Sequence, residues 1–138
     1  MATKKAVPCP TAPDRSAYFN WGLRVTNFRE LFLLTGQIDQ DRNGKVGHPN
    51  DPVGQTRAIF DSLVGMLKAE GWSVDDIIRV EITVTKEVDL AKHRDGIFKV
   101  WSDTLKNVAV KPAAGTMRIV EALARPGFLV EFELMAAR

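Results

Sequence analysis

The chain has 138 residues, of which 45% are hydrophobic and 26% are charged, and its formal net charge is +2. This length and composition predict a single domain over residues 1–138 with a hydrophobic core. The balanced charge gives no basic face for nucleic acid. A single cysteine excludes an internal disulfide, and no apolar run approaches the roughly 18 residues of a membrane span. We therefore expect a cytoplasmic protein without nucleic-acid or membrane partners.

The N-terminal half is predicted to contain an extended segment, two strands and a helix. Residues 1–16 hold three prolines and little periodicity, so we expect an extended lead-in. Trp21 to Val25 alternates loosely and predicts a first strand, and Leu31 to Leu34 is a short apolar run that predicts a buried strand. Asp51-Pro52 is typical of a helix start, because aspartate accepts free amide hydrogens and proline suits the first helical position. The helix is expected over about 52–70 before Gly71, and its inward face comprises Val53, Ile59, Leu63, Met66 and Leu67.

The C-terminal half is predicted to add a strand, a second helix and a hairpin. Apolar and polar residues alternate from Ile78 to Thr85, so this strand has one core face and one polar face that could meet another subunit. Residues 89–105 form the second helical segment, and its inward side comprises Leu90, Ile97, Val100 or Trp101, and Leu105. Residues 115–136 are expected to form two paired strands around a turn at Pro126-Gly127.

The predicted element order is β-β-α-β-α-β-β, which indicates an α+β fold. Strand–helix–strand units favour a mixed sheet with both helices packed on one face. Two helices cannot cover both faces of the sheet. We therefore expect the chain to oligomerise through the uncovered face.

Few residues carry the patterns of known catalytic sites. The sequence has no CxxC, HExxH, GxSxG or phosphate-binding glycine loop, and His48 and His93 lack partners for a metal, so no metal or cofactor is expected. In the predicted hairpin, Arg118 lies roughly opposite Glu133, with Glu131 one pair away. This pair is either a cross-strand ion pair worth about 0.2–1 kcal/mol, or an arginine that binds a carboxylate beside a glutamate that handles a proton or a water.

Thr35-Gly36-Gln37, at the end of the second strand, also has two interpretations. Glycine allows a strand to end with an unusual backbone conformation. Alternatively, it exposes its backbone groups to a ligand, beside the hydroxyl of Thr35.

Three segments together resemble one known family. They are "LFLLTGQI", "GQTRAIFDSLVGMLKAEGWSVDDIIRVEITVT" and "FLVEFELMA". Their order is similar to that of the RidA/YjgF family, also called reactive intermediate deaminases, liver perchloric acid-soluble proteins or translation-inhibitor endoribonucleases. The resemblance runs from about Ala12 to Ala136. It implies a chorismate-mutase-like fold, a homotrimer, and ligand clefts between adjacent subunits.

The resemblance also implies an activity that needs no cofactor. Family members hydrolyse reactive enamines and imines, such as 2-iminopropanoate and 2-iminobutanoate, to keto acids and ammonia. An arginine holds the substrate carboxylate, and a glutamate and backbone groups place the attacking water. Here Thr35-Gly36-Gln37 matches the Ser-Gly-Gln of the family, which implies that Gly36 lines the cleft, and Glu131 matches the water-placing glutamate. The cleft tyrosine of the family falls at Phe19, beside Tyr18.

The chain departs from the family pattern at two places. Pro112-Ala113-Ala114-Gly115 replaces Pro-Ala-Arg-Ser, so the motif arginine is absent, and the segment to Glu131 is about two residues longer. Arg118 is the candidate replacement, because it shares the parity of Ala114 and faces the same side if the strand has no bulge. Thr116 and Arg94 are further candidate ligand-binding residues, and Arg94 or Asp95 stands near the helix asparagine of the family.

Three functions are therefore weighed. The first is a hydrolase of small imine or enamine carboxylates, with Arg118 and Glu131 as catalytic residues. The second is a protein that binds a small carboxylate ligand in the same cleft without catalysis. The third and weakest is an endoribonuclease, against which the near-neutral charge and the lack of a basic aromatic platform argue.

Overall fold

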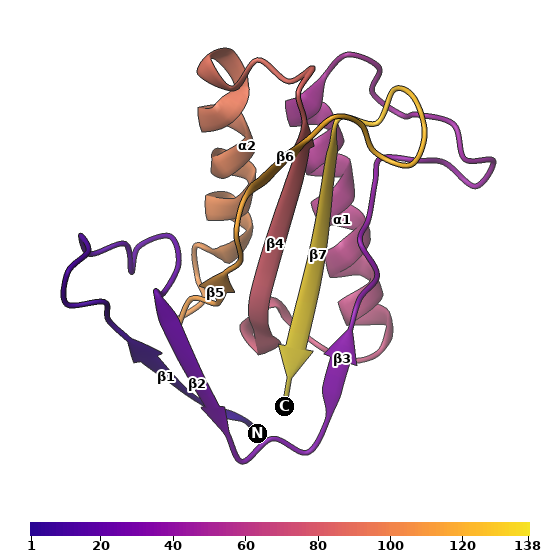
Figure 1. The fold of residues 1–138 in the computed structure, drawn as a ribbon. Helices are drawn as coiled ribbons and strands as arrows, with labels where there is room; N and C mark the ends of the chain where they lie inside the picture. The colour runs from indigo at the N-terminus through magenta and orange to yellow at the C-terminus, as the bar shows by residue number, and fades with distance from the viewer.

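In the computed structural model, which describes residues 1–138, two helices cover one face of a mixed sheet (Figure 1). This confirms the predicted α+β class and the placement of both helices on the same face. The elements in chain order are β1 (Thr3–Val7), β2 (Gly22–Thr26), β3 (Leu31–Leu33), α1 (Pro52–Ala69), the short helix η1 (Val74–Asp76), β4 (Ile77–Thr85), α2 (Leu90–Leu105), β5 (Ala113–Ala114), β6 (Arg118–Val120) and β7 (Val130–Ala137).

The main sheet is built around β4. Its order is β3-β7-β4-β5, and β6 also pairs with β4, further along the same edge as β5. β5 and β6 run parallel to β4, whereas β7 runs antiparallel to both β3 and β4. The predicted hairpin over residues 115–136 is therefore wrong. β6 and β7 lie on opposite sides of β4, because the chain between them crosses the end of this strand (Figure 1).

The first helix follows its sequence signals. The Asp51 carboxylate accepts a hydrogen bond from the Gly54 amide at 2.9 Å, and Pro52 begins α1. Gly71 ends the turn after α1 with φ of +75°, a conformation that glycine adopts without strain. Ile59, Leu63 and Leu67 are fully buried as predicted, but Met66 is 39% exposed. It lies 100° around the helix from Leu67 and falls outside the buried stripe.

The second helix packs against the first at a glycine. A Cβ atom on Gly96 would lie 2.8 Å from a methyl carbon of Val53 on α1, so glycine permits the close helix contact. Ile97, Trp101 and Leu105 face the core, which settles the alternative between Val100 and Trp101 in favour of Trp101. No helix of the chain combines the length and the apolar character needed to cross a membrane.

The expected N-terminal lead-in differs from the prediction, whereas the strand expected at Trp21 to Val25 is present as β2. Part of the expected lead-in forms β1, which pairs antiparallel with β2 from Thr3↔Thr26 to Val7↔Gly22. This two-stranded sheet stands beside the main sheet (Figure 1) and is joined to it by a bridge between Asn20 and Ala113. Residues 3–7 contain no proline, so their backbone amides can all take part in the ladder.

The predicted buried strand at Leu31–Leu34 is an edge strand. Leu31 and Leu33 are 48% and 63% exposed on the face without helices, and only Leu34 is buried. On β4, a bulge after Ile77 places this residue in the core and leaves Ile78 only half-buried, whereas the alternation predicted Ile78 inside. The remaining inward residues of β4, Val80, Ile82 and Val84, are buried as predicted.

Candidate functional site

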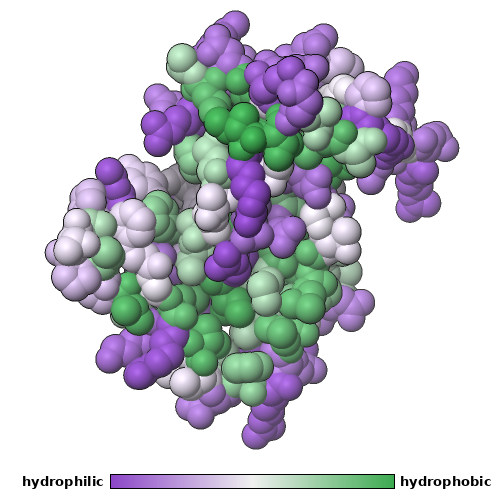
Figure 2. All heavy atoms as spheres, viewed as in Figure 1, coloured by the Kyte–Doolittle hydropathy of each residue, from purple (hydrophilic) through white to green (hydrophobic).

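The face of the sheet away from the helices carries a cluster of charged residues. On β4, the alternation that buries Val80 and Ile82 turns Arg79, Glu81 and Thr83 to this open face. A hydrophilic strip crosses the middle of the face, between hydrophobic areas above and below it (Figure 2). Polar groups between apolar borders are suited to hold a small polar ligand once the borders are covered.

Arg118, Thr83 and Glu131 form one row across the open face of the sheet. Thr83 pairs with Arg118 on one side and with Glu131 on the other. Residues directly opposite one another on neighbouring strands point to the same face, and strands lie about 4.8 Å apart, so the Arg118 and Glu131 backbones are separated by about 10 Å with Thr83 between them. The two predicted catalytic residues are therefore brought to one face, although not through the hairpin from which they were inferred.

Arg118 reaches this face because of one extra residue between β5 and β6. Ala114 pairs with Val80, and Arg118 pairs with Thr83. The chain therefore advances four residues from Ala114 to Arg118 while β4 advances only three residues from Val80 to Thr83. The shift reverses the facing, so that Ala114 packs towards the core and Arg118 points to the open face. The expectation that the two residues share a face is therefore wrong, since it assumed no bulge.

Glu131 lies against Gly36. A Cβ atom built on Gly36 would stand 2.2 Å from a carboxylate oxygen of Glu131, so only glycine lets the two approach this closely. A bulge brings Gly36 to this position. Leu33 pairs with Met135 and Gln37 pairs with Phe132, so the chain from Leu33 to Gln37 has one residue more than the paired stretch of β7. Burial first, and then the neighbouring charge of Glu133, raise the pKa of Glu131 above that of an ordinary glutamate.

Arg118 is only loosely held. Its guanidinium lies 3.6 Å from Glu81, whereas Arg79 donates to the same carboxylate at 2.7 and 3.2 Å. These hydrogen bonds from Arg79, with the charges of both arginines, hold the pKa of Glu81 below its usual range. The predicted pairing of Arg118 with Glu133 is wrong, since Glu133 faces Glu81 on β4. Because Arg79 supplies the short hydrogen bonds to Glu81, Arg118 keeps donors free for a ligand.

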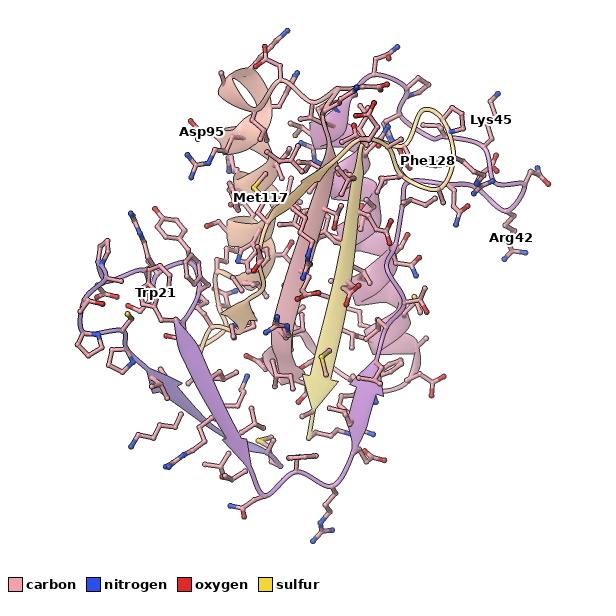
Figure 3. All side chains as sticks on the ribbon, viewed as in Figure 1. Trp21, Arg42, Lys45, Asp95, Met117 and Phe128 are labelled. Carbon is pink, nitrogen blue, oxygen red and sulfur yellow. The ribbon has the colours of Figure 1, made fainter.

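The other predicted ligand-binding residues lie elsewhere. Tyr18, Phe19 and Arg94 line a cleft of about 780 Å³ beside α2, to which the open-face row does not contribute. Trp21, Asp95 and Met117, which also line it, are marked in Figure 3. Thr35 and Thr116 are exposed and line neither the cleft nor the row. The structure therefore places Arg118, Glu131 and Gly36 on the open face and Tyr18, Phe19 and Arg94 in the cleft, and it leaves Thr35 and Thr116 outside both.

Several residues of these two regions were missed as site residues. Arg79, Glu81 and Thr83 were recognised only as the polar face of a strand, although that alternation was the available signal. Trp21, Phe98 and Met117 carried no signal, because the chain brings them together from three separate segments. No group of three or more His, Cys, Asp or Glu residues is arranged to hold a metal ion.

Comparison with known proteins supports the fold over nearly the whole chain. The family model described as endoribonuclease L-PSP matches residues 10–138. The structure is similar to that of YyfB, a Rid-family protein from Yersinia pestis, with a TM-score of 0.82 and 21% identity over 98% of both chains. It is similar to yeast Mmf1, with a TM-score of 0.64 and 20% identity over 99% of both chains. Rv2704 from Mycobacterium tuberculosis, of the YjgF/YER057c/UK114 family, gives 0.61 and 23% identity over 99% of this chain and 100% of that one.

Proposed function

Because the chain belongs to the endoribonuclease L-PSP family, which includes the RidA/YjgF proteins, we propose that it hydrolyses small reactive imine or enamine carboxylates. The products are a keto acid and ammonia. The observation that carries this proposal is the row of Arg118, Thr83 and Glu131 on the open sheet face, in which the pKa of Glu131 is raised by burial.

Arg118 binds the substrate carboxylate in this mechanism. Its guanidinium can donate two parallel hydrogen bonds to a carboxylate, and its only ion pair, to Glu81, is long at 3.6 Å. In an imino acid, the imine carbon is bonded directly to the carboxylate carbon. A substrate held by Arg118 therefore places its imine carbon over Thr83, between Arg118 and Glu131.

Glu131 acts on the water. A raised pKa makes its carboxylate a better base than an ordinary glutamate, and Gly36 leaves room beside it. The water oxygen bonds to the imine carbon while Glu131 accepts a proton. Glu131 then returns this proton to the nitrogen, which gives an amino alcohol. It next transfers the remaining hydroxyl proton to the nitrogen as the carbon–nitrogen bond breaks, so that the carbonyl of the keto acid forms and ammonia leaves. Atoms balance with water as the only co-reactant.

We place the reaction between subunits of a homotrimer. Leu31 and Leu33 leave apolar surface on the same open face as the charged row, and a neighbouring subunit that covers this face would also exclude water from the row. Exclusion of water lowers the effective dielectric constant around the row. The attraction between Arg118 and the substrate carboxylate is therefore stronger.

The test is suppression of imine trapping. An amino-acid-deaminating enzyme generates 2-iminobutanoate in the presence of semicarbazide, and the protein is added in the wild-type, Arg118→Ala and Glu131→Ala forms. We expect the wild type to suppress trapping and both variants to lose at least about 100-fold in rate. Arg57→Ala, which removes an exposed arginine on α1, is the matched control and should keep full activity. A fully active Arg118→Ala protein would refute the assignment.

A second candidate, ligand binding without turnover, is favoured by one observation. Ala114 stands where the family has its motif arginine, so the cleft beside α2 has no cation at this position. Thermal stabilisation by a carboxylate that is not consumed, together with no suppression of imine trapping, would select this function.

A further inference from the structure

Arg79 makes contacts that the proposed hydrolysis does not explain. It lies on the open face of β4 with a side chain that is 45% exposed, and its partners on the neighbouring strands, Ala113 and Met135, carry no charge. Its one ion pair is with Glu81, two residues further along the same strand. The proposed mechanism assigns a step to neither residue. Any effect of Arg79 on the reaction therefore passes through Glu81.

Glu81 is shared unequally between two arginines. Arg79 donates to its Oε1 atom from two nitrogens, at 2.7 Å from Nη2 and 3.2 Å from Nε. The nearest nitrogen of Arg118, Nη1, lies 3.6 Å from the other carboxylate oxygen, which is beyond hydrogen-bond distance. Arg79 therefore holds Glu81 by hydrogen bonds, whereas Arg118 attracts it by charge alone.

The structure keeps Glu81 ionised and gives it a defined place. Hydrogen bonds from Arg79, with the charges of both arginines, lower the pKa of Glu81, so its carboxylate stays negative at neutral pH. A Cβ atom on Gly115 would lie 2.4 Å from the Glu81 Cγ atom, so glycine at this position leaves the space that the side chain occupies. Glu133, opposite Glu81 on β7, supplies no positive charge. Glu81 is therefore an anion beside Arg118 that only the two arginines hold.

Glu81 and a substrate carboxylate compete for the same guanidinium. A carboxylate that binds Arg118 through two hydrogen bonds uses two of its five donors and neutralises its single positive charge. Glu81 needs to approach Arg118 by only about 0.8 Å, from 3.6 Å to the roughly 2.8 Å of a charged hydrogen bond, to make such contacts. Without Arg79, Arg118 would be the only cation left for Glu81, and nothing would hold the carboxylate back.

We propose that Arg79 is a positioning residue, which holds Glu81 away from Arg118 and so keeps Arg118 available for the substrate carboxylate. The proposal rests on the role of Arg118 in the proposed hydrolysis. It adds to that role an internal competitor, Glu81, and a residue that restrains this competitor.

The first test is the effect of Arg79→Gln on KM and kcat. Both constants are measured in the imine-trapping assay, with the imine concentration set by the amount of the generating enzyme. We expect KM to rise about fivefold, the scale of a partly exposed ion pair, while kcat stays within about twofold because Glu131 and the attacking water are unchanged. Lys86→Gln removes a positive charge one residue beyond β4, from an ion pair with Glu121, and should change neither constant. Equal KM values for Arg79→Gln and Lys86→Gln would refute the proposal.

A double variant separates competition from direct substrate binding. Arg79→Gln with Glu81→Gln removes the competitor together with the residue that restrains it, so KM should return to the wild-type value or lower. If Arg79 bound the substrate itself, KM would stay raised in the double variant, and this result would overturn the proposal. Arg79→Lys keeps the charge but not the two-nitrogen fork, and its KM should lie between those of the wild type and Arg79→Gln.

Folding and assembly of each variant are checked by urea unfolding and light scattering. If Arg79→Gln does not fold, Arg79→Lys and Glu81→Gln carry the test. Glu81→Gln removes the competing charge and should give a KM no higher than that of the wild type. A raised KM in a folded Glu81→Gln protein would show that Glu81 helps the substrate to bind, and would overturn the proposal.

A titration without turnover distinguishes this proposal from the proposed hydrolysis. 2-Oxobutanoate is the keto acid formed from 2-iminobutanoate, so it carries the same carboxylate and is not consumed. Its calorimetric Kd should rise about fivefold in Arg79→Gln and return to the wild-type value in the double variant. If this order holds while no form suppresses imine trapping, the hydrolysis is removed and the role of Arg79 stands. If the wild type suppresses trapping but Arg79→Gln leaves both Kd and KM unchanged, the role of Arg79 alone is removed.

Discussion

Replacing Gly36 by alanine tests whether the position of Glu131 matters for activity. The new Cβ would lie 2.2 Å from a Glu131 carboxylate oxygen, and ordinary contact begins at about 3.4 Å, so the carboxylate must move by about 1.2 Å. Gly36 does not have a positive φ, so alanine causes no backbone strain. The clash involves the end of a flexible side chain and can be relieved by its rotation. We therefore expect the variant to fold.

The expected result is a separation of activity from stability. A displacement of about 1 Å at a reacting group costs roughly 100-fold in rate, so Gly36→Ala should lose most of the imine-hydrolysing activity. Its free energy of unfolding, measured with urea, should change by less than about 1 kcal/mol. Gly65→Ala is the matched control, because a Cβ there meets nothing within 4 Å on an exposed helix position, and it should gain about 1 kcal/mol without loss of rate. Full activity of Gly36→Ala would refute the role assigned to Glu131, and an unfolded variant would refute the reasoning about the clash.

Four further predictions rest on other contacts. Gln55 is fully buried, donates to the carbonyls of His48 and Gly127 at 3.0 Å each, and accepts from the Leu129 amide at 2.8 Å. Gln55→Ala should therefore cost about 4 kcal/mol in urea unfolding, with Ser62→Ala on the exposed side of α1 as the control. Burial and Glu133 raise the pKa of Glu131, so the folded state holds this proton to higher pH than the unfolded chain, and the free energy of unfolding should fall as pH rises from the ordinary glutamate range through the folded pKa. Glu133→Gln removes a repelling charge and should move the acidic limb of the rate profile to lower pH; an unmoved limb would show that another group titrates. Leu33→Glu places a charge on the 63% exposed apolar site on the open face and should yield monomers in light scattering in place of the proposed homotrimer, whereas an intact trimer would place the interface elsewhere.

Local signals in the sequence determined the elements with the clearest patterns. The helix start predicted at Asp51-Pro52 and the end predicted before Gly71 agree with the observed ends of α1 within one residue. Capping residues and turn glycines act on their immediate neighbours, so the local sequence is sufficient to locate them. The alternation in β4 predicted Val80, Ile82 and Val84 inside and a polar opposite face. The ordered motifs identified the family and singled out Gly36 and Glu131, which lie in contact in the structure.

Only the tertiary structure decided which strands are partners and which way their side chains point. Alternation defines the two faces of a strand but does not identify its neighbours. The sequence therefore predicted that β6 and β7 pair with each other, whereas they lie on opposite sides of β4. One extra residue before Arg118 reversed its facing relative to Ala114, because side chains in a strand repeat every two residues. The cleft beside α2 likewise depends on contacts between segments far apart in the chain, such as the hydrogen bond from Trp101 to Tyr18. Local sequence patterns do not predict such long-range contacts, because these contacts form only when the sheet and helices pack together.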